Sequence, residues 1–403
     1  MDTTTRAAGV PESRGFPLTT EHRERYEEYR AFAEQWVAPA AAGHDTGQCL
    51  DPAVVEALAE GGHLASFLPR EFGARGIDHL SYGFLHETIG AVCTSTRSLI
   101  TVHDMLAHTV WRWGDDALRA TWLPALAAGT ALGAFALSEP DSSSEAAGLT
   151  TYAETGHGGY VLRGRKKWIS FGQIADVFLV FARMDRGTGA FLVPRDTRGL
   201  TVTPIRGLLG ARASMLAELS LDDCRIPAAQ LLGRPGRAVP QIVASSLTLG
   251  RLGVAAGSTG LVQGCLDTAF PYARERRQGD GRLGDRQLIQ RLLAGLVTDV
   301  EAARLLWLNA ASLMDGDDPR APMAAMVAKH FAAGAAARGT RHAVQILGAA
   351  GCTTEHPVER MFRDAKVMEI IEGSNEIQQI TLGRFGHTDP LSLFPSDDVH
   401  SVN

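Results

Sequence analysis

The sequence predicts an α+β protein, because helical, β-rich and again helical segments follow one another without alternating. Residues 20–133 and 239–386 carry apolar side chains at helical spacing, which predicts an N-terminal helical domain and a C-terminal helical bundle. Residues 134–238 hold short runs of β-branched and aromatic residues between turns, which predicts a central β domain. No glycine-rich dinucleotide motif or phosphate-binding loop lies between a strand and a helix, so a doubly wound nucleotide-binding sheet is disfavoured.

Five helices are expected in the first domain. The clearest start signal is Asp51, an N-cap residue that is followed by Pro52 at the first helical positions. Gly61 and Gly62 then close this helix. The five predicted helices span residues 21–37, 53–60, 79–92, 99–113 and 115–128.

The β segment is expected to form an antiparallel sheet or barrel, because its strand-like runs are short and separated by turn residues. The predicted strands cover residues 160–165, 177–182, 190–193, 200–205 and 216–221. In the last domain, long Ala- and Leu-rich stretches predict helices before a loose C-terminal tail. These helices span residues 240–276, 285–315, 321–348 and 357–371, and the tail covers 387–403.

Composition argues against several classes of protein. The formal net charge is −6 and no basic stripe is present, which disfavours nucleic-acid binding. No run of about 18 uninterrupted apolar residues occurs, so no membrane-spanning helix is expected, and the polar residues 1–20 do not resemble a secretory leader. The five cysteines are odd in number and form no CxxC pair, which favours a reduced, cytoplasmic protein without disulfides or a metal site.

Glu372 is the first candidate for chemistry. It follows two bulky aliphatic residues and precedes Gly373, which would allow the backbone to approach a ligand closely. If this carboxyl is buried, loss of hydration raises its pKa toward the range that suits a general base. The alternative is an ordinary charged residue near a helix end.

Two C-terminal motifs carry a resemblance to a known family. Residues 363–366 read Arg-Asp-Ala-Lys, and residues 371–378 read Ile-Glu-Gly-Ser-Asn-Glu-Ile-Gln. Over residues 20–386 the chain resembles the acyl-CoA dehydrogenase family. The resemblance implies an N-terminal helical domain, an antiparallel β-barrel-like domain and a C-terminal four-helix bundle. It also implies FAD as cofactor, Glu372 as the catalytic base, and a homodimer or homotetramer.

Two further motifs are similar to the family's flavin-contacting segments. In residues 135–145 the resemblance gives cofactor contacts to Phe135, Leu137, Ser138 and Ser144, with Ser144 also able to reach the substrate's pantetheine arm. The loop departs from the family, because Ser143-Ser144-Glu145 stands where Gly-Ser-Asp is usual. In the segment Lys-Trp-Ile-Ser, the resemblance implies that Trp168 shields one flavin edge and that Ser170 bonds near the flavin N5 atom. A strand tryptophan is otherwise a core residue.

Further cofactor contacts are implied in the C-terminal domain, where the chain resembles the segments that hold the FAD diphosphate and adenosine across a subunit interface. The residues concerned are Arg276, Gln278, Gln287, Gln345, Gly348, Ser374 and Glu376. Arginine suits a diphosphate because its guanidinium presents paired donors. The chain departs from the family at residues 279–282, which read Gly-Asp-Gly-Arg and lack the usual aromatic residue.

Substrate contacts are predicted from Arg97, Thr101 and Arg251, together with Ser144 and Gly373. Arg97 interrupts an apolar helical stretch, and a buried arginine needs an anionic or strongly polar partner. In the glutaryl-CoA branch of the family, the matching arginine binds the distal carboxylate of the acyl chain. The alternative for Arg97 is an internal salt bridge with Asp104 or Glu87.

A second resemblance concerns the carrier of the acyl group. Residues 93–98, 114–121 and 366–374 look like the branch that oxidises short hydroxylated acyl groups on acyl-carrier proteins, in polyketide extender-unit formation. This second resemblance implies a biosynthetic enzyme. The alternative is a catabolic short-chain or glutaryl-type acyl-CoA dehydrogenase. The expected electron acceptor is an electron-transfer flavoprotein or oxygen. Two other possibilities are a flavin oxygenase or oxidase on the same fold, and a non-catalytic docking module.

Overall fold

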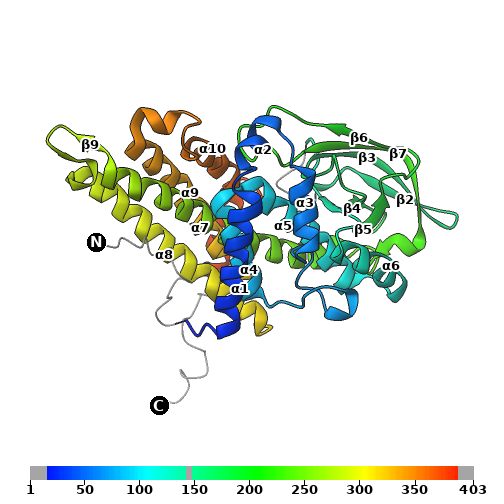
Figure 1. The fold of residues 1–403 in the computed structure, drawn as a ribbon. Helices are drawn as coiled ribbons and strands as arrows, with labels where there is room; N and C mark the ends of the chain where they lie inside the picture. The colour runs from blue at the N-terminus through cyan, green and yellow to red at the C-terminus, as the bar shows by residue number, and fades with distance from the viewer. Residues whose placement is uncertain (1–15, 142–147, 389–403) are drawn as a thin grey trace, which may run out of the picture.

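The computed structural model describes residues 16–141 and 148–388 (Figure 1). Its N-terminal part is helical, as predicted. Asp51 caps a helix by accepting the Ala53 N–H at 2.9 Å, and Pro52 occupies the first helical turn. A π-helical segment, Ala33–Val37, extends the first helix. The helices are α1 (Thr20–Phe32), α2 (Ala41–Gly47), α3 (Pro52–Glu60), α4 (His79–Val92), α5 (Thr94–Trp113) and α6 (Asp116–Ala127).

A twisted sheet follows the N-terminal helices, in the order β6-β7-β3-β2-β4-β5-β8. The antiparallel arrangement that we predicted is not complete, because β2 meets β4 in parallel at the Tyr152–Arg183 pair, and β1 pairs parallel with β4 along its whole length. The β2–β3 hairpin lies between these two strands in the chain and forms part of the long crossover that a parallel pair requires. The strands are β1 (Gly133–Ala136), β2 (Tyr152–Gly156), β3 (Gly159–Ile169), β4 (Val177–Arg183), β5 (Thr188–Pro194), β6 (Leu200–Pro204), β7 (Ala217–Pro227) and β8 (Leu231–Leu232).

The C-terminal part consists of long helices that pack side by side, away from the sheet (Figure 1). A two-stranded hairpin, β9 (Arg277–Gln278) and β10 (Gly281–Arg282), connects the first two of them. The fourth predicted helix ends at Met368 rather than at residue 371, because a tight turn begins there. The helices are α7 (Ala244–Glu275), α8 (Gln287–Asp315), α9 (Ala321–Leu347), α10 (Val358–Met368) and α11 (Asn375–Thr388). Most of the predicted tail lies outside the described residues.

Glycines on α4 and α7 bring the N-terminal helices into backbone contact with the C-terminal ones. A β-carbon at Gly260 would lie 1.9 Å from the Glu87 carbonyl oxygen, and a β-carbon at Gly90 would lie 2.5 Å from the Gly257 carbonyl oxygen. The Glu87 carboxylate then accepts hydrogen bonds from Arg304 Nη2 at 2.6 Å and from Trp307 Nε1 at 2.9 Å. This contact joins α4, α7 and α8, and α5 packs on α7 beside it. Within the described residues, no helix is both long and apolar enough to cross a membrane.

The close approach of α4 and α7 leads to a stability prediction. Gly260→Ala should destabilise the protein by about 1–3 kcal/mol through overpacking, although alanine is intrinsically favoured over glycine in a helix by about 1 kcal/mol. Gly295→Ala on α8 is the matched control, because its β-carbon would lie 3.5 Å from the His342 ring, an ordinary contact. The measurement is the midpoint of thermal unfolding. Equal midpoints for the two variants would contradict the proposed constraint.

Candidate active site

Glu372 lies in the tight turn between α10 and α11. Its backbone φ is 54°, and the φ of Gly373 is 89°, so both residues are in the left-handed region. Glycine tolerates this region freely, whereas a residue with a β-carbon is strained there. The Asn375 N–H donates to the Glu369 carbonyl oxygen at 2.9 Å and closes the turn. The surrounding contacts must therefore hold Glu372 in a conformation that its own backbone does not favour.

The Glu372 carboxylate reaches α7 at a position that has no side chain. A β-carbon at Gly250 would lie 2.8 Å from Glu372 Oε2. Burial raises the pKa of the Glu372 carboxyl, and the positive charges of Arg251, Arg97 and Lys329 oppose this shift. Arg251 also donates from Nε to the Glu372 carbonyl oxygen at 3.3 Å. The result is a carboxyl with increased proton affinity, as a general base requires.

A pocket of about 250 Å³ opens beside Glu372. We call it the acyl pocket. One wall is apolar and comes from residues 208–211 and from Ile370 and Ile371, whereas α5 supplies polar groups. The lining includes five residues that the sequence analysis assigned to the site, from three separate segments: Arg97, Thr101, Trp168, Ser170 and Glu372.

Arg97 is buried, with 1% of its surface exposed, yet it lines the acyl pocket. Its Nη1 donates to Thr101 Oγ1 at 2.9 Å, and its Nη2 donates to Ser98 Oγ at 2.9 Å and faces Met368 Sδ at 3.3 Å. Burial lowers the pKa of Arg97 to about 10, so the side chain remains charged at neutral pH. Among the described residues, none provides a carboxylate in a direct ion pair with this guanidinium.

The alternative salt bridges for Arg97 are wrong. Glu87 is occupied by Arg304 and Trp307. Asp104 accepts the Ala65 N–H through Oδ1 at 2.7 Å, and burial raises the pKa of its carboxyl well above the ordinary value, which favours the neutral form. The guanidinium of Arg97 therefore retains its charge in a pocket where hydroxyl groups are its oxygen partners.

Trp168 lies at an irregularity in β3. Its φ is 64°, and the register between β3 and β7 shifts between Lys166 and Ile169. The bulge leaves 49% of the Trp168 surface exposed, with Lys167 Nζ 4.9 Å from the ring centroid. A strand tryptophan in the core would be buried, so the alternative core assignment for Trp168 is wrong. Ser170, just beyond the bulge, also lines the acyl pocket.

The segment around β1 lies next to this bulge. The Ser138 carbonyl oxygen accepts the Lys167 N–H at 3.0 Å, and Phe135 packs against Phe181 with ring centroids 5.0 Å apart. Phe135, Leu137 and Ser138 are not part of the acyl-pocket lining. Ser144 lies outside the described residues.

A buried ion pair that the sequence analysis missed fixes this segment. Lys166 Nζ donates to Glu139 Oε1 at 2.8 Å and to the Leu137 carbonyl oxygen at 3.0 Å, and both charged side chains are fully buried. The same carboxylate accepts the N–H groups of Thr150 and Thr151 at 2.7 and 3.0 Å. The only signal in the sequence was a lysine within a strand, which does not identify its partner.

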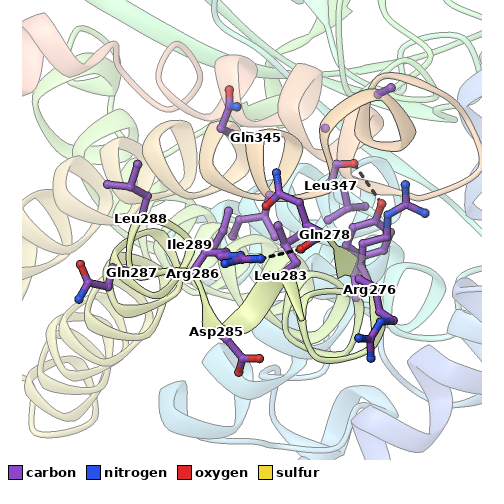
Figure 2. A pocket seen from close by; sticks show the side chains of 15 residues that line it. Arg276, Gln278, Leu283, Asp285, Arg286, Gln287, Leu288, Ile289, Gln345 and Leu347 are labelled. Atoms are coloured by element: carbon purple, nitrogen blue, oxygen red, sulfur yellow. Dashed lines mark hydrogen bonds between the residues drawn. The ribbon is translucent and has the colours of Figure 1, made fainter. Parts of the chain in front are cut away.

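A second, larger pocket of about 820 Å³ lies at the junction of α7, α8 and α9 (Figure 2). We call it the Arg276 pocket. The acyl pocket shares none of its lining residues. It brings together five residues that the sequence analysis assigned to the cofactor, and Gly348, at a φ of 62°, follows the end of α9 there. These residues are Arg276, Gln278, Gln287, Gln345 and Gly348.

The atypical segment 279–282 forms the hairpin beside this pocket. Arg286 bridges it, because its Nη2 donates to the Gln278 carbonyl oxygen at 2.6 Å (Figure 2). The same atom also donates to Asp280 Oδ1 at 3.0 Å. The Arg286 guanidinium therefore supports the hairpin, whose residues 279–282 read Gly-Asp-Gly-Arg. Ser374 and Glu376 line neither pocket, and Ser374 Oγ instead accepts the Ile377 N–H at 3.4 Å at the start of α11.

The donor groups of the two pockets fit a flavin dinucleotide in their chemistry. Guanidinium and amide groups in the Arg276 pocket suit a diphosphate and an adenosine. The exposed ring of Trp168 and the Ser170 hydroxyl stand beside the pocket that contains Glu372. The fold and these two pockets define a flavoprotein oxidoreductase with space for an acyl group.

Family models cover nearly all of the described chain. The acyl-CoA dehydrogenase N-terminal domain matches residues 19–130, the middle domain matches residues 134–224, and the C-terminal domain matches residues 241–386. The chain belongs to the acyl-CoA dehydrogenase family, whose members are FAD-dependent oxidoreductases acting on acyl thioesters.

Relatives include both acyl-CoA dehydrogenases and a polyketide enzyme. The mitochondrial short-chain specific acyl-CoA dehydrogenase of Mus musculus is 38% identical, over 92% of this chain and 90% of its own. The structure of glutaryl-CoA dehydrogenase from Mycobacterium smegmatis has a TM-score of 0.88 at 31% identity and covers 94% of this chain and 97% of its own. FkbI, described as acting in biosynthesis of a methoxymalonyl extender unit, has a TM-score of 0.82 at 33% identity and covers 90% of this chain and 99% of its own.

Proposed function

We propose that the protein is a dehydrogenase of a short, polar acyl thioester, with Glu372 as the catalytic base. One observation carries this proposal: a carboxyl of raised proton affinity and a charged, buried guanidinium line the same pocket. A pocket of about 250 Å³ suits a short acyl group rather than a long one. The structure also gives no support to a purely non-catalytic docking module, which would not need such a carboxyl.

The base would act on the substrate carbon next to the thioester carbonyl. Glu372 takes the α-proton, and FAD supplies the acceptor for the hydride that leaves the β-carbon, so that an α,β-double bond forms. With a hydrated C3 aldehyde, Glu372 instead takes the hydroxyl proton while the hydride leaves C3, and a carboxylic acid results. Both reactions need an ionised Glu372, which the positive charges of Arg251, Arg97 and Lys329 favour.

Arg97 is proposed to select a polar or anionic acyl group. Its guanidinium meets two hydroxyl oxygens, of Thr101 and Ser98, and an incoming carboxylate or hydroxyl would complete its hydrogen bonding. The relation to a glutaryl-CoA dehydrogenase supports this assignment.

The carrier of the acyl group has two candidate identities. We propose a thioester on an acyl-carrier protein in polyketide extender-unit formation, which the likeness to FkbI supports. The alternative is a catabolic acyl-CoA dehydrogenase, which the 38% identity to a short-chain acyl-CoA dehydrogenase favours. Electrons would pass to an electron-transfer flavoprotein or to oxygen.

A homodimer or homotetramer is part of the proposal. The acyl pocket and the Arg276 pocket have separate linings within one chain. Leu288, at the start of α8 in the Arg276 pocket, is 73% exposed, and Phe270 on α7 is also exposed. A second copy of the chain that covers these apolar side chains would place its own acyl pocket and Arg276 pocket in the same assembly.

The second prediction concerns the proposed base. Glu372→Gln removes the proton acceptor but keeps the shape of the side chain, so flavin should stay bound while the rate of flavin reduction falls by about 10²–10⁴-fold. Anaerobic stopped-flow bleaching of the visible flavin band measures this rate. Reduction at the wild-type rate would remove Glu372 from the role of base.

The third prediction concerns Arg97. Arg97→Met should cause a selective loss of kcat/KM for acyl groups that carry a carboxylate or hydroxyl, by about tenfold or more because a charged hydrogen bond is lost. A plain butyryl thioester serves as the matched control substrate and should be affected much less. An equal loss with both substrates would return Arg97 to a structural role.

The carrier is tested by paired anaerobic titrations. The same short polar acyl group is presented on acyl-carrier protein and on CoA, and bleaching of the oxidised flavin is followed. We expect bleaching with the carrier-protein form at concentrations where the CoA form has little effect. Bleaching by the CoA thioester alone would instead establish the catabolic alternative.

A further inference from the structure

Lys329 is a buried lysine that the proposed reaction does not yet use. It lies in the N-terminal half of α9 with none of its surface exposed. Lysine is almost never buried completely unless it is paired. Its Nζ donates to the Gly373 carbonyl oxygen at 3.0 Å and to Asn375 Oδ1 at 3.3 Å. Both acceptors are neutral. Gly373 belongs to the turn that carries Glu372, and Asn375 begins α11 directly after it, so contacts to this segment offset the cost of burying the ammonium group.

The turn needs such contacts because its backbone is strained. Glu372 has a φ of 54°, and a non-glycine residue in the left-handed region costs roughly 1–2 kcal/mol. Side chains from three helices donate to its two carbonyl groups. Arg251 on α7 reaches the Glu372 carbonyl oxygen at 3.3 Å, whereas Lys329 on α9 and Gln378 on α11 both reach the Gly373 carbonyl oxygen at 3.0 Å.

The charge of Lys329 also acts on the Glu372 carboxyl. Burial lowers the pKa of Lys329 to about 7. The carboxylates of Glu372, Glu369 and Glu376 raise this pKa, and Arg251 lowers it further. In return, the positive charge of Lys329 lowers the pKa of the Glu372 carboxyl, together with Arg251 and Arg97.

We infer that Lys329 is a positioning residue, which holds the Glu372 turn against α9 and places an ammonium group beside it. This inference rests on the proposed role of Glu372. Lys329 touches neither the acyl pocket nor the Arg276 pocket, so its effect passes entirely through the turn and its charge.

The test is Lys329→Met, which keeps the length and apolar stem of the side chain but removes the charge and the donor. We expect bound flavin and KM to remain within about threefold of wild type, while the rate of flavin reduction falls by about 10–100-fold because the carboxylate is misplaced. Loss of the positive charge raises the pKa of Glu372. The acidic limb of the pH profile of kcat/KM should therefore move to higher pH.

Lys366→Met is the matched control. Lys366 lies on α10 and pairs with Glu369 at 2.9 Å, but its side chain is exposed to solvent, which screens its charge. This variant should keep the wild-type rate and pH profile. A Lys329→Met enzyme with an unchanged rate and an unchanged acidic limb would overturn the inference.

Two further variants keep the result interpretable. Lys329→Gln retains an amide donor without the charge, so it should keep more of the rate than Lys329→Met and still show the displaced acidic limb; if Lys329→Met does not fold, an unchanged limb in Lys329→Gln overturns the inference. Glu372→Gln is measured alongside. Flavin reduction at the wild-type rate by Glu372→Gln would reject the assignment of Glu372 as the base. If Glu372→Gln is impaired but the Lys329 variants have normal kinetics, only the positioning role of Lys329 is rejected.

Discussion

The glycines along one face of α7 are the constraint on which the acyl pocket depends. Gly257 and Gly260 allow α4 to approach until the backbones touch, and the aliphatic part of Arg97 packs where a β-carbon at Gly257 would be. Gly250, two turns earlier on the same helix, leaves room for the Glu372 carboxylate. One helix thus sets the position of both charged groups of the acyl pocket, although they come from opposite ends of the chain.

The site also contains more positive than negative side chains. Arg97, Arg251 and Lys329 are buried or largely buried around a single carboxyl. Hydroxyl and carbonyl oxygens, rather than carboxylates, are the oxygen partners of Arg97 and Lys329. A region with more positive than negative groups stabilises an anion that enters or develops there, because little water is present to screen the interaction.

Much of the fold could be predicted from periodicity and turn residues, and the helix capped by Asp51 begins where expected. The parallel pairing of β1 with β4 could not be predicted, because a four-residue strand carries no signal for the strand with which it pairs. The motif predicted that Glu372 lies in the site, and it does line the acyl pocket. The salt bridges considered for Arg97 could be excluded only from the partners of Glu87 and Asp104. Lys329 had no signal, because a lysine in an alanine-rich helix does not indicate a turn 44 residues away.

The contact between α4 and α7 also has a consequence for how the chain folds during synthesis. The two helices are separated by about 150 residues, so α4 leaves the ribosome long before α7 does. At about 5–20 residues per second, the delay is roughly 8–30 s. Throughout that interval the face of α4 that packs on α7 lacks its native partner, and the N-terminal helices reach their final packing only after the β segment and much of α7 have been translated.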